Sequence, residues 1–342
     1  MACLRHIDLL YVFAYGQGRG NSGSRQNGPS RKTQSPEFSM PLFKNIIFYR
    51  IAPDWMPPPL EQLEAELQRL AFSPCMPTQE LSSGWVPPRG ADEGAMVESI
   101  NGQWIVKLAV ERKAVPGGAV RTELDERCKL IEAQSGRKPG RKEKSEIKDE
   151  IILGFLPRAF SKRAAHTIWL DLEQRYVVIA AGTMKSAEPV VKHLLDLMAE
   201  LGHVLSLAPV ATSVAPATAM GEWLTTRQAP AGFVIDRDLE LKNPGEEKSS
   251  VRYSRHTLAL DEIAQHIDEG KLPTQLAMTW NDKVSFVLTE QLGIRKIDIR
   301  GVEDTPRGED GFDADVAIAT GELSLLLPEL LESLGGELLE AA

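Results

Sequence analysis

The stretch TIWLDLEQRYVVIAAGTMKSAEPVVKHLLDLMAEL, residues 167–201, decides the fold class. Its first part, residues 167–180, predicts a β-hairpin. Its second part, residues 187–201, carries apolar residues at helical spacing and predicts an amphipathic helix. Because two strands joined by a short turn pair antiparallel, this order of elements differs from a strict alternation of single strands and helices. It favours an α+β fold built from antiparallel sheets and helices.

The same kinds of element recur from Met40 to the C-terminus. Asn101-Gly102 is the strongest hairpin turn signal, and Asn281-Asp282 predicts a second turn. A pair of glycines, Gly335-Gly336, predicts the end of the last helix. We predict strands or hairpins over residues 43–51, 96–111 and 275–299, and helices over residues 60–70, 121–153 (broken near 136–140), 261–269 and 313–334.

The composition is that of a globular protein. Of 342 residues, 42% are hydrophobic and 25% charged, which argues against wholesale disorder. At about 100–200 residues per domain, this length predicts two or three domains or one large elongated one. No stretch reaches the roughly 18 uncharged apolar residues that span a bilayer, so no membrane partner is expected. Three widely spaced cysteines, Cys3, Cys75 and Cys128, form neither a disulfide framework nor a CxxC pair, which fits a reducing cytoplasm.

The net charge of −9 is unevenly spread along the chain. Residues 1–39 carry a net charge of +3, residues 40–300 one of −2, and residues 301–342 one of −10. Within the near-neutral body, residues 137–163 carry a net charge of +5. The overall acidity therefore does not exclude nucleic acid as a partner, provided that the cations share one surface.

The first 39 residues look like an appendage. They predict either a disordered N-terminal extension or the product of a start codon upstream of the authentic Met40. Gly18, Gly20 and Gly23 match G-x-G-x-x-G, but the residues that follow cannot open the helix that a dinucleotide site needs. No cofactor is expected.

The search for catalytic motifs leaves one enzyme hypothesis open. The chain has no phosphate-binding GxxxxGK[ST] loop, no GxSxG nucleophile elbow and no HxxxH pair. Asp313, Asp315 and Glu322 could serve as the carboxylates of a metal-dependent DNA-processing enzyme. The simpler interpretation of Asp313 and Asp315 is that acids at the start of a helix complement its dipole.

The basic run RKPGRKEKSEIKDEIILGFLPRAFSKR, residues 137–163, is the main binding candidate. Its Phe160 lies among cations, as expected of a DNA-contacting loop in which cations meet phosphates and an aromatic ring wedges or stacks. The alternative is a solvated charged helix with a buried Phe. A second, strand-like run, VRYSRHTL at residues 251–258, and Lys271 after the next helix add further cations.

Several motifs, in their order along the chain, resemble one known family. They are MPLFKNIIFYRI at 40–51, LAFSPC at 70–75, GWVPP at 84–88, NGQ at 101–103, KDEIILGFLPRAFS at 148–161, IDEGKLPTQLAMTW at 267–280, FDAD at 312–315 and TGEL at 320–323. With these motifs, residues 40–342 resemble the recombination-associated protein RdgC family. We expect approximate parts at 40–115 (α+β), 116–163 (charged helices and loop) and 164–342 (hairpins and helices, with a C-terminal helix).

This resemblance implies a non-enzymatic protein that binds double-stranded DNA without sequence preference, and single-stranded DNA more weakly. It implies an elongated, horseshoe-like subunit, paired in a ring-shaped homodimer whose hole encloses the duplex. Such a protein restrains RecA-mediated recombination, assists replication fork maintenance, and is cytoplasmic and nucleoid-associated. No metal is implied.

The resemblance also assigns residues. Phe160 matches the family's loop aromatic, and Arg255 and His256 occupy a segment near the gate between subunits where a Lys-Gln pair is typical. Lys271 matches a basic position after the short helix. The expected DNA-contacting residues are Arg141, Lys142, Lys144, Lys148, Arg158, Phe160, Lys162, Arg163, Arg255, His256 and Lys271.

Overall fold

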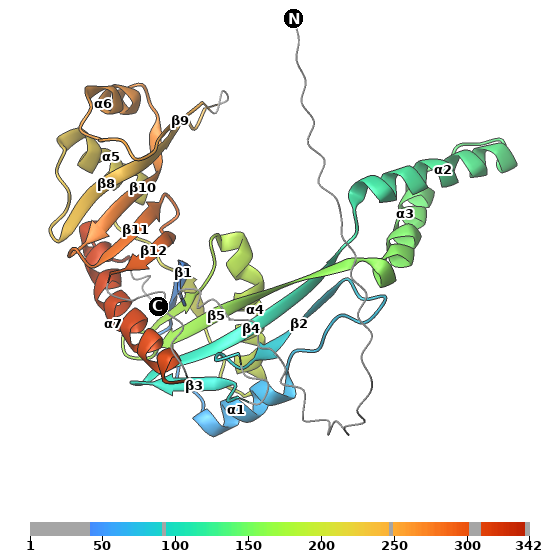
Figure 1. Ribbon diagram of the computed structural model, residues 1–342, viewed down its shortest axis with the longest axis horizontal. Helices are drawn as coiled ribbons and strands as arrows, with labels where there is room; N and C mark the ends of the chain where they lie inside the picture. The colour runs from blue at the N-terminus through green and yellow to red at the C-terminus, as the bar shows by residue number, and fades with distance from the viewer. Residues whose placement is uncertain (1–41, 91–93, 246–248, 301–308, 339–342) are drawn as a thin grey trace, which may run out of the picture. The chain divides into compact units, whose positions relative to one another are not determined.

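The computed structural model describes residues 42–90, 94–245, 249–300 and 309–338 (Figure 1). The expectation for residues 1–39 lies outside this range. The described residues contain a twelve-stranded sheet with the main strand order β2-β4-β5-β6-β1-β12-β11-β10-β8-β9, to which β3 and β7 add at β4 and β1. All pairs of these strands are antiparallel. Together with seven α-helices in the described part, they confirm the α+β class.

Strand β1 (Asn45–Ile51) joins the two halves of the sheet. Its first residues, Asn45 and Ile46, pair with β12, whereas Ile47 to Arg50 pair with β6. The strand is rich in apolar and aromatic residues because both of its faces are covered, and Ile46, Phe48 and Ile51 are all buried.

The first half of the sheet packs its core against two helices. Buried residues of β4, β5 and β6, including Leu108, Ile168 and Val177, meet Leu63 of α1 and Leu194 of α4. The elements of this half are α1 (Leu60–Arg69), β2 (Leu81–Val86), β3 (Val97–Ile100), β4 (Gln103–Ala114), β5 (Phe160–Asp171), β6 (Tyr176–Ile179), α4 (Met184–Glu200) and β7 (Leu207–Pro209).

The second half packs mainly against the long C-terminal helix. Buried side chains of β10 and β11, such as Met278 and Phe286, share a core with Leu323 and Leu330 of α7. The elements are α5 (Pro216–Thr226), β8 (Phe233–Lys242), β9 (Ser250–Tyr253), α6 (Asp261–Asp268), β10 (Leu272–Trp280), β11 (Val284–Thr289), β12 (Ile294–Ile299) and α7 (Glu309–Ser333).

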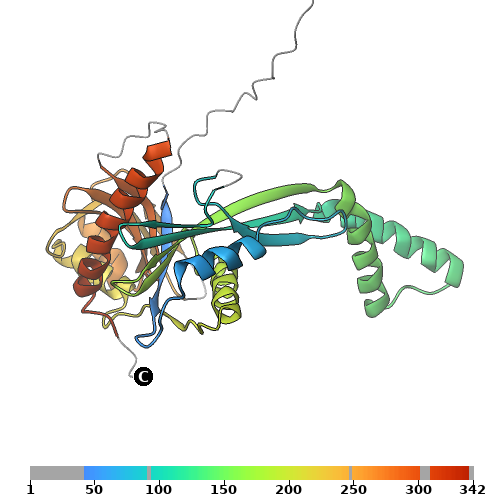
Figure 2. The same ribbon diagram turned by 90° about the horizontal axis from the view of Figure 1, so that it is seen from below.

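A helical hairpin stands at the far end of the β4–β5 ladder (Figures 1 and 2). Strand β4 leads into α2 (Gly117–Ser135), α3 (Arg141–Phe155) returns, and the 3-10 turn Leu156–Arg158 leads into β5. Val120 is the buried residue of α2 and Ile151 that of α3. Because so little of its surface is buried, the hairpin presents most of its charged side chains to solvent.

The structure confirms most predicted elements and corrects two. The turns at Asn101-Gly102 and Asn281-Asp282 join adjacent strands, and the charged helical region breaks at Gly136, which has a left-handed φ of 71°. The expected loop around Phe160 is instead the start of β5, and Arg255 lies beyond the end of β9 rather than in a strand. Within the described ranges, every helix is too short or too polar to cross a membrane.

Candidate nucleic-acid interface

Three exposed cations form a stripe along α3. At about 100° per residue, Arg141, Lys144 and Lys148 fall within about 60° of one another around the helix axis. All three are exposed, and no ion pair within the described residues involves them. The stripe begins at the helix N-terminus, where Glu143 accepts a hydrogen bond from the backbone N–H of Gly140 at 3.3 Å. These three side chains are therefore available to an external anion.

Four of the hairpin's other cations, Arg127, Arg137, Lys138 and Lys142, have acidic partners. Lys142 lies 3.9 Å from Glu146 on the same helix, one turn on. The side-chain hydrogen bond from Arg137 lowers the pKa of Glu143 below its usual value. The remaining ion pairs are Arg127 with Glu123 and Glu150, and Lys138 with Glu132. Lys142, predicted alongside its neighbours, thus differs from them in having a partner.

The β4–β5 ladder carries a second cationic group. In the antiparallel register, Arg112 lies opposite Lys162, and Ala114 lies opposite Phe160. Directly opposite residues share a face, so Phe160, Lys162 and Arg112 lie on one side of the ladder. Arg158 is exposed in the turn just before β5. Phe160 is 90% exposed, which excludes the buried alternative for this side chain in the described chain.

Arg163 lies on the opposite face from Lys162, because successive strand residues alternate. Its guanidinium lies 4.0 Å over the ring of Phe72. The cross-strand neighbour Glu111 is buried and accepts a hydrogen bond from the backbone N–H of Cys75 at 3.4 Å. The two adjacent cations at the end of RAFSKR therefore serve two different surfaces.

The candidates after residue 250 lie in the segments that follow β9 and α6. Strand β9 is at the opposite end of the strand order from β2 and β4. Arg255 and His256 are exposed, and the backbone N–H of Arg255 donates to Asp238 at 2.8 Å. The Lys271 side chain is only 13% exposed, and its Nζ lies 2.8 Å from Glu269 and 3.0 Å from His266. Because its charge is compensated internally, we leave Lys271 out of the proposed interface.

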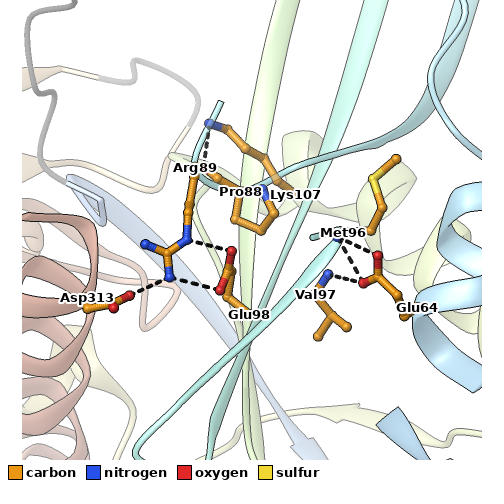
Figure 3. A network of polar contacts seen from close by, with 8 residues as sticks. All are labelled: Glu64, Pro88, Arg89, Met96, Val97, Glu98, Lys107 and Asp313. Atoms are coloured by element: carbon orange, nitrogen blue, oxygen red, sulfur yellow. Dashed lines mark hydrogen bonds and ion pairs between the residues drawn. The ribbon is translucent and has the colours of Figure 1, made fainter. Parts of the chain in front are cut away.

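The carboxylates of the enzyme hypothesis do not converge. Asp313 accepts a hydrogen bond from Arg89 at 2.6 Å, and Arg89 also donates to Glu98 at 2.6 Å (Figure 3). The hydrogen bond to Glu98, and then the one to Asp313, raise the pKa of Arg89. The Arg89 guanidinium also lies 4.9 Å over the ring of Phe312. Two of the quoted motifs thus meet in space, since the residue after GWVPP binds FDAD.

The other two carboxylates lie elsewhere on α7. Glu322 accepts a hydrogen bond from Lys283 at 3.2 Å. Asp315 is two residues from Asp313, and side chains two apart on a helix point to different sides. Among the residues that the structure describes, no three His, Cys, Asp or Glu side chains gather as a group that could hold a metal ion.

Sequence inspection missed Arg112. It lies one residue beyond the end of the predicted hairpin 96–111, and nothing local marks it as a neighbour of Lys162. The signal is the pairing of β4 with β5, which joins residues 50 positions apart in the chain. Knowledge of that register alone would have placed Arg112 beside the RAFSKR motif.

Comparison with known proteins agrees with the motifs. Residues 41–337 match a family described as "RdgC: Putative exonuclease, RdgC". The recombination-associated protein RdgC of Dechloromonas aromatica is 41% identical over 308 residues, which cover 87% of this chain and 99% of the relative. The protein of the same name from Janthinobacterium sp. is 41% identical over 301 residues, 86% of this chain and 98% of the relative. The chain therefore belongs to the RdgC family.

Proposed function

We propose that this protein binds double-stranded DNA without sequence preference and acts in homologous recombination by restraining RecA. The observation that carries the proposal is the stripe of Arg141, Lys144 and Lys148, which has no acidic partner among the described residues. At a rise of about 1.5 Å per residue, the stripe is roughly 10 Å long. That length matches about three phosphates at about 3.4 Å of axial rise per strand.

The ladder extends the same chemistry. Arg112, Arg158 and Lys162 add three more cations, and Phe160 adds an exposed ring that can wedge or stack. Phosphate contacts carry no sequence information, so cations that meet phosphates give binding without sequence preference. The relatives' name, recombination-associated protein, supports placing this binding in recombination.

The protein is further proposed to act as a homodimer that encloses the duplex in a ring. Two features support contacts at two separate places. The helical hairpin exposes Leu130 by 61% and Leu153 by 52%. Strand β9 pairs with β8 alone in the described sheet, which leaves an edge for another strand. A ring also lets an acidic protein hold DNA, because its cations can face inward while its acids face outward.

The experiment compares two triple variants with the same change in charge. In the stripe variant, Arg141, Lys144 and Lys148 become Gln. In the control, the ion-paired Arg137, Lys138 and Lys142 become Gln. The stripe variant should lose between two and three units of the slope of log Kobs against log salt, at about 0.9 unit per phosphate contact, and the control less than about one unit. Equal losses in both variants would contradict the assignment of the interface to the stripe.

Nuclease activity is the competing function, since the family description names a putative exonuclease. Supercoiled and linearised plasmids incubated with the protein and magnesium should both stay intact. The linear plasmid supplies the ends that an exonuclease needs. Nicking or degradation that Asp315→Asn abolishes would overturn the proposal that the protein only binds DNA.

The proposed ring has its own test. The salt titration of DNA binding is repeated on circular and linear plasmids, because an encircling protein is retained on the circle and slides from free ends.

A further inference from the structure

A pocket of about 420 Å³ lies on the face of the β4–β5 ladder opposite Lys162. Ala109 and Ala165 pair directly across the two strands and both line it, so the only side chains at this point are methyl groups. Phe72, Pro87 and Met96 supply apolar walls, and two cations, Lys107 and Arg163, also line it. The pocket is separate from the stripe on α3.

Gly84 of the GWVPP motif shapes this pocket. A Cβ on Gly84 would lie 2.5 Å from the Cα of Phe72, so only glycine lets the chain cross here. The crossing segment is held by two backbone hydrogen bonds, from Phe72 N–H to Trp85 O at 2.8 Å and from Trp85 N–H to Leu70 O at 3.0 Å. This close approach places the Phe72 ring under the Arg163 guanidinium.

The chemistry of the pocket fits a flat ring that carries an anion. The alanine floor and apolar walls accept a planar apolar face, and aromatic rings and guanidinium planes are the surfaces on which unpaired bases stack. Arg163 is exposed, has no ion pair within the described residues, and can meet a phosphate. The methyl groups of the floor cannot hydrogen-bond to base edges. Lys107, which also lines the pocket, donates to the backbone carbonyl of Pro88 at 3.3 Å.

We propose that this pocket holds one unpaired base of single-stranded DNA, with Arg163 on the adjoining phosphate. The inference rests on the proposed function, because it takes exposed cations of this protein, here Arg163, to hold a DNA backbone. It adds that unpaired DNA has its own binding site on the protein. A duplex, whose bases are stacked and paired, does not occupy this site.

The test uses the full-length protein and two labelled single strands of about 12 residues, within the usual range of single-strand site sizes. One is oligo(dT), and the other is an abasic deoxyribose phosphate strand of equal charge. Fluorescence anisotropy should show that the wild type binds oligo(dT) about tenfold more tightly, the effect of stacking one base. Ala165→Leu fills the floor of the pocket and should abolish this ratio.

Ala164→Leu is the matched control. Ala164 is the preceding residue of β5, is also exposed, and lies on the other face, so this variant should keep the tenfold ratio. Phe72→Leu, which removes the ring and keeps an apolar side chain, should lower the ratio even if Ala165→Leu folds poorly. Equal affinity of the wild type for both strands would overturn the proposal. The alternative occupant would then be an apolar side chain of a protein partner.

Two further arms separate the possible explanations. Thymidine monophosphate should not displace oligo(dT), since it lacks the further phosphates through which an oligonucleotide binds. If thymidine monophosphate displaces oligo(dT) from the wild type but not from Ala165→Leu, the pocket binds a free nucleotide and the proposal is overturned. Duplex affinity is measured in parallel and should be unchanged in Ala165→Leu. A wild type that binds the duplex but shows no base effect would thus contradict the pocket alone, whereas a wild type that does not bind the duplex would contradict the proposed function.

Discussion

Arg50, at the centre of the sheet, and Arg141, at the start of α3, carry the same charge in opposite surroundings. Arg50 donates from Nε to Glu337 at 2.8 Å, and its guanidinium lies 3.8 Å over the ring of Tyr176. Burial, and then a hydrogen bond to Glu337, raise the pKa of Tyr176. Arg141 is exposed and has no acidic partner in the described chain. A basic residue in the sequence therefore predicts binding only when its partners are known.

Substitution of Arg50 tests the difference between the two environments. Arg50→Met leaves the carboxylate of Glu337, whose side chain is 12% exposed, without its cation, although the Tyr176 hydroxyl still donates to it at 2.8 Å. The variant should lower the free energy of unfolding by about 3 kcal/mol. Urea denaturation measures this effect. Lys142→Met, which removes an exposed ion-paired cation, is the control and should cost less than about 1 kcal/mol. Similar losses in both variants would show that the two environments are energetically alike.

A substitution at Gly84 tests the close approach of β2 to residues 71–72. Gly84→Ala places a methyl group against the backbone of Phe72 and should destabilise the protein by about 2 kcal/mol. Gly154→Ala is the opposite case, because α3 is helical there and no atom lies within 4 Å of the added Cβ. It should stabilise the protein by up to about 1 kcal/mol. If Gly84→Ala leaves the free energy of unfolding unchanged in the same denaturation experiment, the close approach does not require glycine here.

Asp313 separates structural acids from catalytic ones. Asp313→Asn weakens the contact with Arg89, but the Asp313 side chain is 53% exposed, so the loss of stability should be about 1 kcal/mol or less. Duplex DNA binding should be unchanged, and no nuclease activity should disappear. A folded Asp313→Asn variant that loses a magnesium-dependent cleavage present in the wild type would contradict the structural role.

Local patterns predicted the elements well because short-range chemistry determines them. Asn101-Gly102 favours a tight turn, and the apolar spacing of residues 60–70 suits a helix of any protein. The sequence also located the basic run that contains the α3 stripe. Its failures concern partners. The i,i+4 spacing of Lys142 and Glu146 marks a pair that a helix brings together, and Lys144 has no acid at that spacing. The contacts of Lys271 with Glu269 and His266 depend instead on how the chain leaves α6.

The larger arrangement was beyond sequence inspection for the same reason. The division of β1 between two half-sheets and the pairing of Arg112 with Lys162 depend on contacts between distant residues. Asp313 illustrates the consequence: acids at a helix start suggest a dipole interaction, whereas the structure also gives Asp313 a specific partner in Arg89. The pocket beside Phe72 likewise exists only because residues 71–72, β2, β4 and β5 come together.

The salt dependence of duplex binding by the wild-type protein tests the central claim most directly. Six cations on α3 and the ladder, each neutralising one phosphate, predict a slope of log Kobs against log salt near −5, the same for unrelated sequences of equal length. A slope near zero, or an affinity that follows base sequence rather than salt, would contradict the claim that exposed, unpartnered cations make this protein a DNA-binding protein.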